Sequence, residues 1–228
     1  MKKLWLLMVG LCIFTTVSCR ANNTDLEQLI KEYRANKIAL YTQENELYAD
    51  YEVDAAFIGD SLTDGYDVKR FYPDIIVSNR GIGGDTTFDL EARLEVSLYD
   101  LKPKVVVMLI GANNFKTMFD NYEQILIGYK TNLPNTRVIL LSLTSMSMEW
   151  GKNNDIAKEN NIKIKALAEK YSFEYVDLYS ALLNEETKEI YPEYTIDGGH
   201  LTEAGYIVLT EQITPVLNEE LKLWNTLK

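Results

Sequence analysis

Two residues of this chain have the types and the surroundings for hydrolytic chemistry. Ser61 lies in the stretch "FIGDSLTDGY", residues 57–66, directly after an apolar run, and His200 is the only histidine. A serine becomes a nucleophile when an imidazole takes its proton and a carboxylate orients that imidazole. Because Asp197 lies three residues before His200 in "TIDGGHLTEAGY", residues 195–206, its carboxylate can reach the ring if this glycine-containing loop curls.

Each of these residues also has a purely structural interpretation. Serine is a favoured helix N-cap, so Ser61 could simply start the element that follows the apolar run. His200 precedes "LTE", which is typical of a helix start, so structure alone can explain that loop too. Hydrolases use the order Ser, Asp, His along the chain, but the order by itself does not decide between the two interpretations.

A glycine-rich loop, "NRGIGGDTT" at residues 79–87, follows the second apolar run. A glycine such as Gly84 can leave a bare backbone N–H facing a ligand at the start of the next helix. The loop does not fit the dinucleotide fingerprint, because Thr86 stands where that pattern needs a glycine and because the loop follows the second strand. The alternative is a simple turn with Asp85 or Thr86 as the helix cap.

The third apolar run ends in "GANNF", residues 111–115. Paired asparagines commonly serve turns, because they tolerate left-handed backbone and hydrogen-bond locally. A side-chain amide beside a nucleophile can instead stabilise the negative charge that develops on a carbonyl oxygen during acyl transfer. Both roles remain open for Asn113 at this point.

Five short apolar runs, rich in β-branched residues, lie near residues 53, 75, 104, 137 and 173. Their nearly continuous hydrophobicity is typical of strands buried on both faces of a parallel sheet. Amphipathic stretches at about 86–101, 119–132, 153–171 and 202–223 separate or follow them. This alternation predicts an α/β sandwich with a parallel sheet of about five strands, in which ligands bind beyond the carboxyl ends of the strands.

Composition narrows the classes of partner and chemistry. The chain has 228 residues, 46% of them hydrophobic and 25% charged, which fits one globular domain. Its formal net charge of −11 makes nucleic acid an unfavourable partner, because phosphate backbones would be repelled. With one histidine available as a ligand we expect no metal site, and no pattern indicates a cofactor.

The first residues have the pattern of an export signal. Lys2 and Lys3 precede an apolar stretch, Leu4 to Val17, that is too short to span a bilayer. The stretch ends in "TVSC", which resembles a bacterial lipobox, with Cys19 as the acylated residue. Thr16 stands where that pattern usually has leucine, so cleavage by an ordinary signal peptidase is the alternative.

We therefore expect three segments: a signal peptide of possible lipoprotein type at 1–19, a leading helical segment at 20–51 and a catalytic domain at 52–228. The leading segment carries apolar residues at helical spacing and contains neither glycine nor proline. The expected location is outside the cytoplasm of a bacterium, as a periplasmic or cell-surface lipoprotein. Any membrane attachment should come from the N-terminal lipid.

Four blocks resemble those of the GDSL or SGNH hydrolase family: "GDSL" at 59–62, "GGDT" at 83–86, "GANN" at 111–114 and "DGGH" at 197–200. They occur in the family's order across residues 57–206. The resemblance implies a flavodoxin-like three-layer α/β/α fold and ester hydrolysis through an acyl-enzyme.

The same resemblance assigns roles to individual residues. Ser61 would be the nucleophile, His200 the base and later the acid, and Asp197 the carboxylate that orients the histidine. The oxyanion hole would take the backbone N–H groups of Ser61 and Gly84 and the side-chain amide of Asn113. The third block departs from the common Gly-x-Asn-Asp, because Asn114 follows Asn113; this change concerns the supporting contact that the neighbour makes.

The sequence around the blocks is most similar to that of platelet-activating-factor acetylhydrolase-like enzymes and bacterial carbohydrate acetylesterases. That similarity favours a short acyl group, acetyl, on a carbohydrate. A lysophospholipase or acyl-thioesterase of the same family is an alternative, and a non-catalytic carbohydrate-binding protein on the same fold is an alternative of another class. The oligomeric state and the residues that set specificity are not indicated by the sequence, and Trp150, Tyr191 and Tyr194 could equally be packing residues or substrate contacts.

Overall fold

A five-stranded parallel sheet forms the centre of the fold, with the strand order β2-β1-β3-β4-β5. The structure is a computed structural model that describes residues 23–226. The strand order is that of flavodoxin-like folds, so the predicted α/β sandwich with about five parallel strands is confirmed. The strands are β1 (Ala55–Gly59), β2 (Val77–Gly81), β3 (Val105–Leu109), β4 (Arg137–Leu141) and β5 (Glu174–Val176).

The central strands are buried on both faces of the sheet, which explains why their sequences are apolar without alternation. Along β3, Val106 and Met108 belong to one hydrophobic core, whereas Val105, Val107 and Leu109 belong to the core on the other face. Successive side chains of a strand point to opposite faces, so a strand covered on both sides needs apolar residues at every position.

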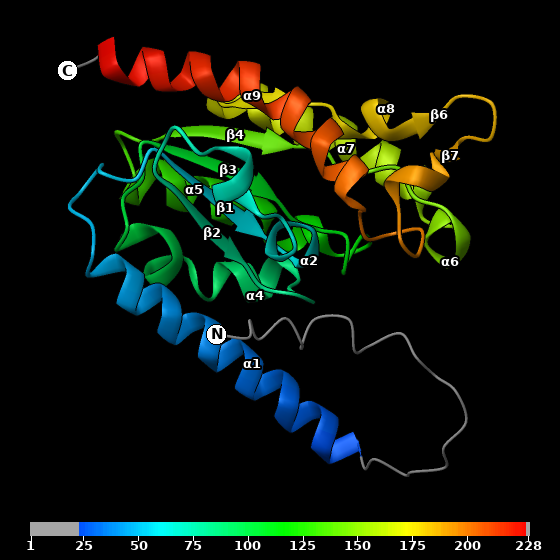
Figure 1. Ribbon diagram of the computed structural model, residues 1–228, viewed down its shortest axis with the longest axis horizontal. Coiled ribbons are helices and arrows are strands. Elements are labelled where there is room, and N and C mark those ends of the chain that lie inside the picture. Colours follow the sequence, from blue (N-terminus) through cyan, green and yellow to red (C-terminus); the bar gives the residue numbers. More distant parts are fainter. Residues whose placement is uncertain (1–22, 227–228) are drawn as a thin grey trace, which may run out of the picture. The chain divides into compact units, whose positions relative to one another are not determined.

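Helices cover both faces and close the two cores. The first core is completed by α4 (Thr87–Glu91), the π-type turn η1 (Glu95–Tyr99), α5 (Tyr122–Asn132) and α7 (Asn154–Tyr171). The second is completed by α8 (Leu178–Leu182) and α9 (Glu203–Thr226). Figure 1 shows α9 running across one face of the sheet with α4 on the other. The fold is therefore a three-layer sandwich.

Several short elements near the strand ends are too brief to leave a periodic pattern in the sequence. Two single-turn helices follow β1, one follows β4, and a small antiparallel ribbon precedes α9. These elements shape the edge of the sheet at which the predicted site residues lie. They are α2 (Ser61–Asp64), α3 (Val68–Phe71), η2 (Met118–Asp120), α6 (Met148–Gly151), β6 (Leu183–Asn184), β7 (Glu189–Ile190) and η3 (Pro192–Tyr194).

The chain divides into two compact units, and the boundary between them in the sequence falls after Ala35. This boundary lies within the helix α1 (Asn23–Asn45). The second unit, Asn36–Lys228, contains the sheet and the last turns of α1. Within it, the Tyr41 hydroxyl donates a hydrogen bond to the Gly81 carbonyl (2.6 Å) at the end of β2. The predicted signal peptide and Cys19 lie outside the described residues. Among the described helices, none combines the length and the apolar character that a membrane span requires.

A buried ion pair joins the carboxyl ends of β1 and β2 to the segment after α4. Arg93 Nε donates to Asp85 Oδ2 (2.7 Å), and the same guanidinium donates to the Gly59 carbonyl (3.0 Å) and to Ser97 Oγ (2.8 Å). The side chains of Arg93 and Asp85 are 4% and 0% exposed. Because Gly59 lies two residues before Ser61, this pair supports the turn that carries Ser61.

We predict that Arg93→Met lowers the free energy of unfolding by about 3 to 5 kcal/mol, because it leaves the Asp85 carboxylate buried without its cation. Urea-induced unfolding monitored by circular dichroism measures this difference. The matched control is Arg70→Met, since Arg70 forms its ion pair with Glu203 at the surface and its unfolding midpoint should stay nearly unchanged. Equal midpoints for the two variants would contradict this account of Arg93.

Candidate active site

Ser61 is the first residue of α2, and the residue before it provides the helix cap. The side chain of Asp60 accepts a hydrogen bond from the Leu62 N–H (3.1 Å), which is the contact of an N-cap. The structure therefore does not support the interpretation of Ser61 as a simple capping residue. Its hydroxyl remains available for another partner.

That partner is the imidazole of His200. His200 Nε2 lies 3.0 Å from Ser61 Oγ, and His200 Nδ1 lies 2.7 Å from Asp197 Oδ2. The three side chains thus form one hydrogen-bonded line from hydroxyl to imidazole to carboxylate. This is the arrangement in which a serine hydroxyl can lose its proton to a histidine held by an acid.

The loop before α9 curls around the carboxylate of Asp197. Asp197 Oδ1 accepts hydrogen bonds from the backbone N–H groups of Gly199 (3.0 Å) and His200 (2.8 Å), while Oδ2 faces the imidazole. Burial raises the pKa of the Asp197 carboxyl, but the hydrogen bonds from His200 and Gly199 outweigh it and leave that pKa below its usual value. Asp197 is therefore a carboxylate at neutral pH.

Gly84 and Asn113 lie at the same edge of the sheet as Ser61. β2, β1 and β3 are neighbours in the sheet, and these three residues follow the carboxyl ends of those strands. Gly84 is exposed and has a left-handed backbone with φ +83°. Asn113 is also exposed, and its Nδ2 donates to the carbonyl of Asp85 (2.9 Å), beside Gly84. One amide hydrogen of Asn113 is engaged in this way, and the second can serve a ligand.

Asn114 makes the supporting contact that the departure from the common block had left open. Its Nδ2 donates to Thr87 Oγ1 (2.9 Å), and its Oδ1 accepts from the Thr87 N–H (3.3 Å). The network continues from Thr87 Oγ1 to Asn121 Oδ1 (2.6 Å) and from Asn121 Nδ2 to Glu91 Oε2 (2.7 Å). An asparagine therefore connects the loop after β3 to α4.

Tyr206 of α9, the helix after His200, contacts α2 and the residues that follow Ser61. The Tyr206 hydroxyl donates to the Leu62 carbonyl (2.9 Å), and its ring stacks on Tyr66 with centroids 5.1 Å apart and an interplanar angle of 10°. Helical periodicity marks Tyr206 as part of the buried face of α9. The sequence does not indicate its partner, because Leu62 lies 144 residues away along the chain.

The segment between β4 and α7 contacts the loop that carries Asp197 and His200. The Ser147 N–H donates to the Gly198 carbonyl (2.9 Å), and the rings of Trp150 and His200 meet edge to face with centroids 6.2 Å apart. The sequence leaves the role of Trp150 open and does not single out Ser147. Both residues follow β4, and a position after a strand end is the one feature of the sequence that could have marked them. Neither belongs to one of the four sequence blocks that resemble the family.

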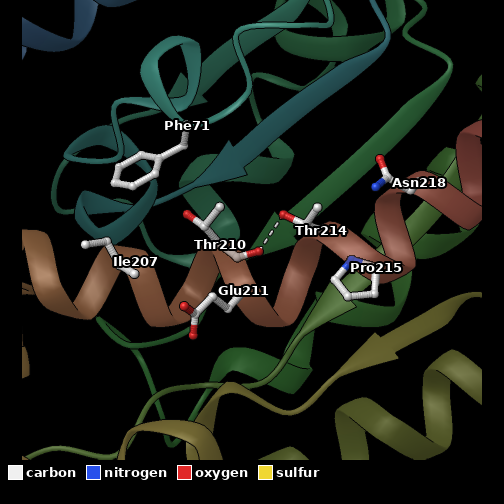
Figure 2. Close-up of a pocket in the computed structure, with 7 residues that line it drawn as sticks. All are labelled: Phe71, Ile207, Thr210, Glu211, Thr214, Pro215 and Asn218. Carbon is white, nitrogen blue, oxygen red and sulfur yellow. Dashed lines mark hydrogen bonds between the residues drawn. The ribbon is translucent and has the colours of Figure 1, made fainter.

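A cavity of about 470 Å³ lies away from these residues, between α3 and α9. Figure 2 shows Phe71 of α3 facing Ile207 and Thr210 of α9 there. Its lining contains none of the three residues of the hydrogen-bonded line. In the part of the chain that the structure describes, no group of three or more His, Cys, Asp or Glu side chains is placed to hold a metal ion.

A flavodoxin-like sandwich with serine, histidine and aspartate joined at the carboxyl edge of its sheet has the architecture of a hydrolase. The chain belongs to the GDSL-like Lipase/Acylhydrolase family, whose model matches residues 57–208. The family is described as one of lipases and acylhydrolases. The predicted family is confirmed by this match.

Two curated relatives and one solved structure illustrate the similarity. Platelet-activating factor acetylhydrolase IB subunit alpha2 of Homo sapiens is 32% identical over 127 residues, covering 52% of this chain and 54% of that protein. The chain thus spans about half the length of the platelet-activating factor acetylhydrolase subunits that it matches. An acetylxylan esterase of Geobacillus stearothermophilus is 28% identical over 195 residues, covering 67% and 88% respectively. A GDSL-like lipase from Bacteroides thetaiotaomicron superposes with a TM-score of 0.70 at 25% identity, covering 80% and 97%.

The carboxyl of Asp60, which caps α2, is buried. It is 1% exposed, and its Oδ2 has no hydrogen-bond partner. Burial raises the pKa of this carboxyl to about 7, and the nearby Asp85 adds to the increase, while the Leu62 N–H and His200 act in the opposite direction. The carboxyl therefore carries a proton in a folded chain at mildly acidic pH.

A pH-dependent stability follows from Asp60. Its folded pKa of about 7 exceeds the usual 3.8, so the folded chain binds one more proton between these values and loses stability as the pH rises. We predict that Asp60→Asn removes this loss, so that between pH 5 and 6 the unfolding free energy of the unmodified chain falls relative to the variant by about 1.4 kcal/mol. Urea unfolding at the two pH values measures it.

The control for this measurement is the exposed Asp74, whose Asp74→Asn variant should follow the unmodified chain across the same pH range. If the difference between the unmodified chain and Asp60→Asn stayed constant from pH 5 to 7, Asp60 would be ionised throughout, and the assigned pKa would be wrong.

Proposed function

We propose that this enzyme is an exported serine esterase that removes short acyl groups, chiefly acetyl, from carbohydrate through an acyl-serine intermediate. The observation that carries the proposal is the continuous hydrogen-bonded line from Ser61 Oγ through His200 to Asp197. No cofactor enters the reaction, because each proton transfer can be made by a side chain of this line.

In the first half of the reaction Ser61 attacks the ester carbonyl carbon. His200 Nδ1–H donates to the Asp197 carboxylate, which leaves Nε2 unprotonated and able to take the Ser61 proton. The tetrahedral intermediate then collapses, the bond to the alcohol oxygen breaks, and His200 Nε2–H protonates that oxygen. The products of this half are a free alcohol and an acyl group on Ser61.

The negative charge of the tetrahedral intermediate falls on the former carbonyl oxygen. Three donors are proposed for it: the backbone N–H groups of Ser61 and Gly84, and Nδ2 of Asn113. The hydrogen bond from Asn113 Nδ2 to the Asp85 carbonyl orients this amide before substrate arrives. Donors fixed in advance stabilise developing charge without reorganising during the reaction.

Water completes the cycle. His200 Nε2 accepts a proton from water, whose oxygen attacks the acyl carbon, and then returns the proton to Ser61 Oγ as the acid product departs. The lowered pKa of Asp197 keeps its charge in place while His200 is positively charged. The same line of residues therefore serves both halves.

The substrate class rests on the relatives. Acetylxylan esterase and platelet-activating factor acetylhydrolase are both named for the release of acetyl, and the first is named for a polysaccharide substrate. The acetylxylan esterase is matched over 88% of its length. Both names support acetyl as the acyl group, and the name of the acetylxylan esterase supports carbohydrate as the alcohol.

Location is proposed from the leader alone. Lys2, Lys3 and the apolar stretch that follows support export, and "TVSC" supports attachment through a lipid on Cys19. A periplasmic or cell-surface lipoprotein of a bacterium would meet polymeric carbohydrate directly. The net charge of −11 argues against nucleic acid and against an anionic membrane as partners of the protein surface.

We predict that Asn113→Ala lowers turnover by about 100- to 1000-fold, or roughly 3 kcal/mol of transition-state stabilisation, while the protein stays folded. The measurement is kcat with an acetyl ester, alongside circular dichroism. Asn218→Ala, at an exposed position of α9, is the matched control and should keep full activity. A variant at Asn113 with unchanged turnover would remove this residue from the proposed oxyanion hole.

We expect the full chain to hydrolyse nitrophenyl esters with a rate that falls steeply from acetyl to dodecanoyl, because the proposed substrate carries acetyl. Ser61→Ala serves as the blank, since it lacks the attacking oxygen. Labelling of Ser61 by a fluorophosphonate probe provides an independent reading of its reactivity.

The other outcomes of this series distinguish the alternatives. A Ser61-dependent rate that rises with chain length would replace the proposal with a lysophospholipase or thioesterase. No rate above the blank, together with no labelling, would favour a binding protein that has lost turnover.

A further inference from the structure

Three apolar residues lie on or next to the loop that carries His200, and the reaction described above does not use them. Met148 and Trp150 come from the segment 147–150 between β4 and α7, and Ile196 belongs to the loop itself, beside Asp197. We propose that these three residues form the subsite for the alcohol part of the ester, and that this alcohol subsite takes the carbon–hydrogen face of a sugar ring. The inference rests on the proposed function, because it specifies the substrate of the same reaction.

The direction of the reaction places the alcohol on the histidine side. His200 Nε2–H must reach the departing alcohol oxygen, whereas the carbonyl oxygen faces Gly84 and Asn113. The alcohol therefore leaves past the residues that surround His200. Side chains that contact the histidine loop from outside are the ones that the alcohol meets.

The segment 147–150 packs directly against that loop. A Cβ atom placed on Gly199 would lie 2.8 Å from Trp150 Nε1, and one placed on Gly198 would lie 3.1 Å from Met148 Cβ. The Trp150 ring meets His200 edge to face at 6.2 Å between centroids. Trp150 and Met148 are thus immediate neighbours of the residues that precede and include the catalytic histidine.

Two of the three side chains are exposed although they are apolar. Met148 is 70% exposed and Ile196 is 69% exposed, and Trp150 is partly exposed. Met148 also has a left-handed backbone, with φ +51°, which is unfavourable for a residue with a side chain. A strained, exposed methionine next to Gly198 of the histidine loop does not serve the core, and it points to a role in binding.

The surface is held rigidly from below. The buried Asn154 of α7 accepts from the Met146 N–H (2.9 Å) and donates to the Met146 carbonyl (2.8 Å), directly before the segment 147–150. Ser147 then donates its N–H to Gly198 (2.9 Å). A binding surface whose backbone is fixed before the ligand arrives loses little conformational entropy on binding.

An open apolar surface with a polar border suits a sugar ring better than an alkyl chain. A pyranose presents a carbon–hydrogen face to apolar and aromatic side chains while its hydroxyls stay in water, whereas an alkyl chain gains most when it is enclosed. Glu149 and Lys152, paired at 3.6 Å, have side chains 94% and 71% exposed and lie next to the subsite in sequence. They offer hydrogen-bond partners for ring hydroxyls.

The test compares two acetyl esters that differ only in their alcohol: an acetylated methyl xyloside and ethyl acetate. In the full chain, Met148→Ala/Ile196→Ala should lower kcat/KM for the xyloside by about 10-fold, mainly through KM, and leave ethyl acetate within about 2-fold. The control variant is Leu47→Ala/Ile162→Ala, which removes equally exposed apolar side chains (73% and 72%) elsewhere and should change neither rate.

Binding of the product alcohol gives a second reading that does not need turnover. Methyl xyloside should change the tryptophan fluorescence of the unmodified chain, the double variant at Met148 and Ile196 should need about 10-fold more sugar for the same change, and Trp150→Phe should lose the response. Absence of any sugar-dependent response in the unmodified chain would overturn the alcohol subsite.

The remaining outcomes also decide. Equal losses on both esters would mean that the variants disturb His200, and a changed preference between acetyl and butyryl esters would place these residues in the acyl site; either overturns the proposal. A larger loss with octyl acetate than with the xyloside would replace the sugar with an alkyl alcohol. If the unmodified chain hydrolysed neither ester faster than Ser61→Ala does, the proposed function itself would be wrong. A loss of activity confined to the variants would leave the proposed function intact.

Discussion

The hydrogen bond of 3.0 Å between Ser61 Oγ and His200 Nε2 joins two points that are 139 residues apart in the sequence. Such a contact is lost when its atoms separate by a few tenths of an ångström. The fold must therefore define the distance between the end of β1 and the start of α9 very closely. A rigid parallel sheet fixes the first point, and α9, packed across the second core of that sheet, fixes the other.

Tyr206 is the direct link between these two points. Its hydroxyl on Leu62 and its ring on Tyr66 connect the first turns of α9 to the residues just after Ser61. Beneath the same turn, Asp60 and Asp85 place two buried carboxyl groups next to each other, and Arg93 balances only one of them through a direct ion pair. Burial of charged groups of this kind lowers stability. It persists here because Asp60 caps the turn that begins at Ser61, and because Arg93, the partner of Asp85, holds the Gly59 carbonyl.

The sequence predicts the parts of this arrangement that leave a local pattern. Continuous apolar runs predicted strands covered on both faces, and the resemblance of four blocks to a known family predicted that Ser61, Asp197 and His200 act together. The burial of Asp60 could not be predicted from the "GDSL" block, because burial of a carboxyl depends on which other parts of the chain pack over it. The partners of Arg93, Tyr206 and Ser147 are likewise long-range contacts. The helices α2 and α6 have four residues each, about one turn, which is too short to repeat a helical pattern.

The two glycines in "DGGH" are required by close contacts with a neighbouring segment, and not only by backbone flexibility. Gly198 has φ +87°, and a Cβ atom there would lie 2.3 Å from the Ser147 carbonyl oxygen. At Gly199 a side chain would enter the indole of Trp150. The glycines are therefore the places where the loop of Asp197 and His200 touches the segment 147–150. Because that segment also bears Met148 and Trp150, the contact that positions the histidine is the same one that brings the proposed alcohol subsite to it, so the geometry of catalysis and the choice of alcohol depend on one short stretch of backbone.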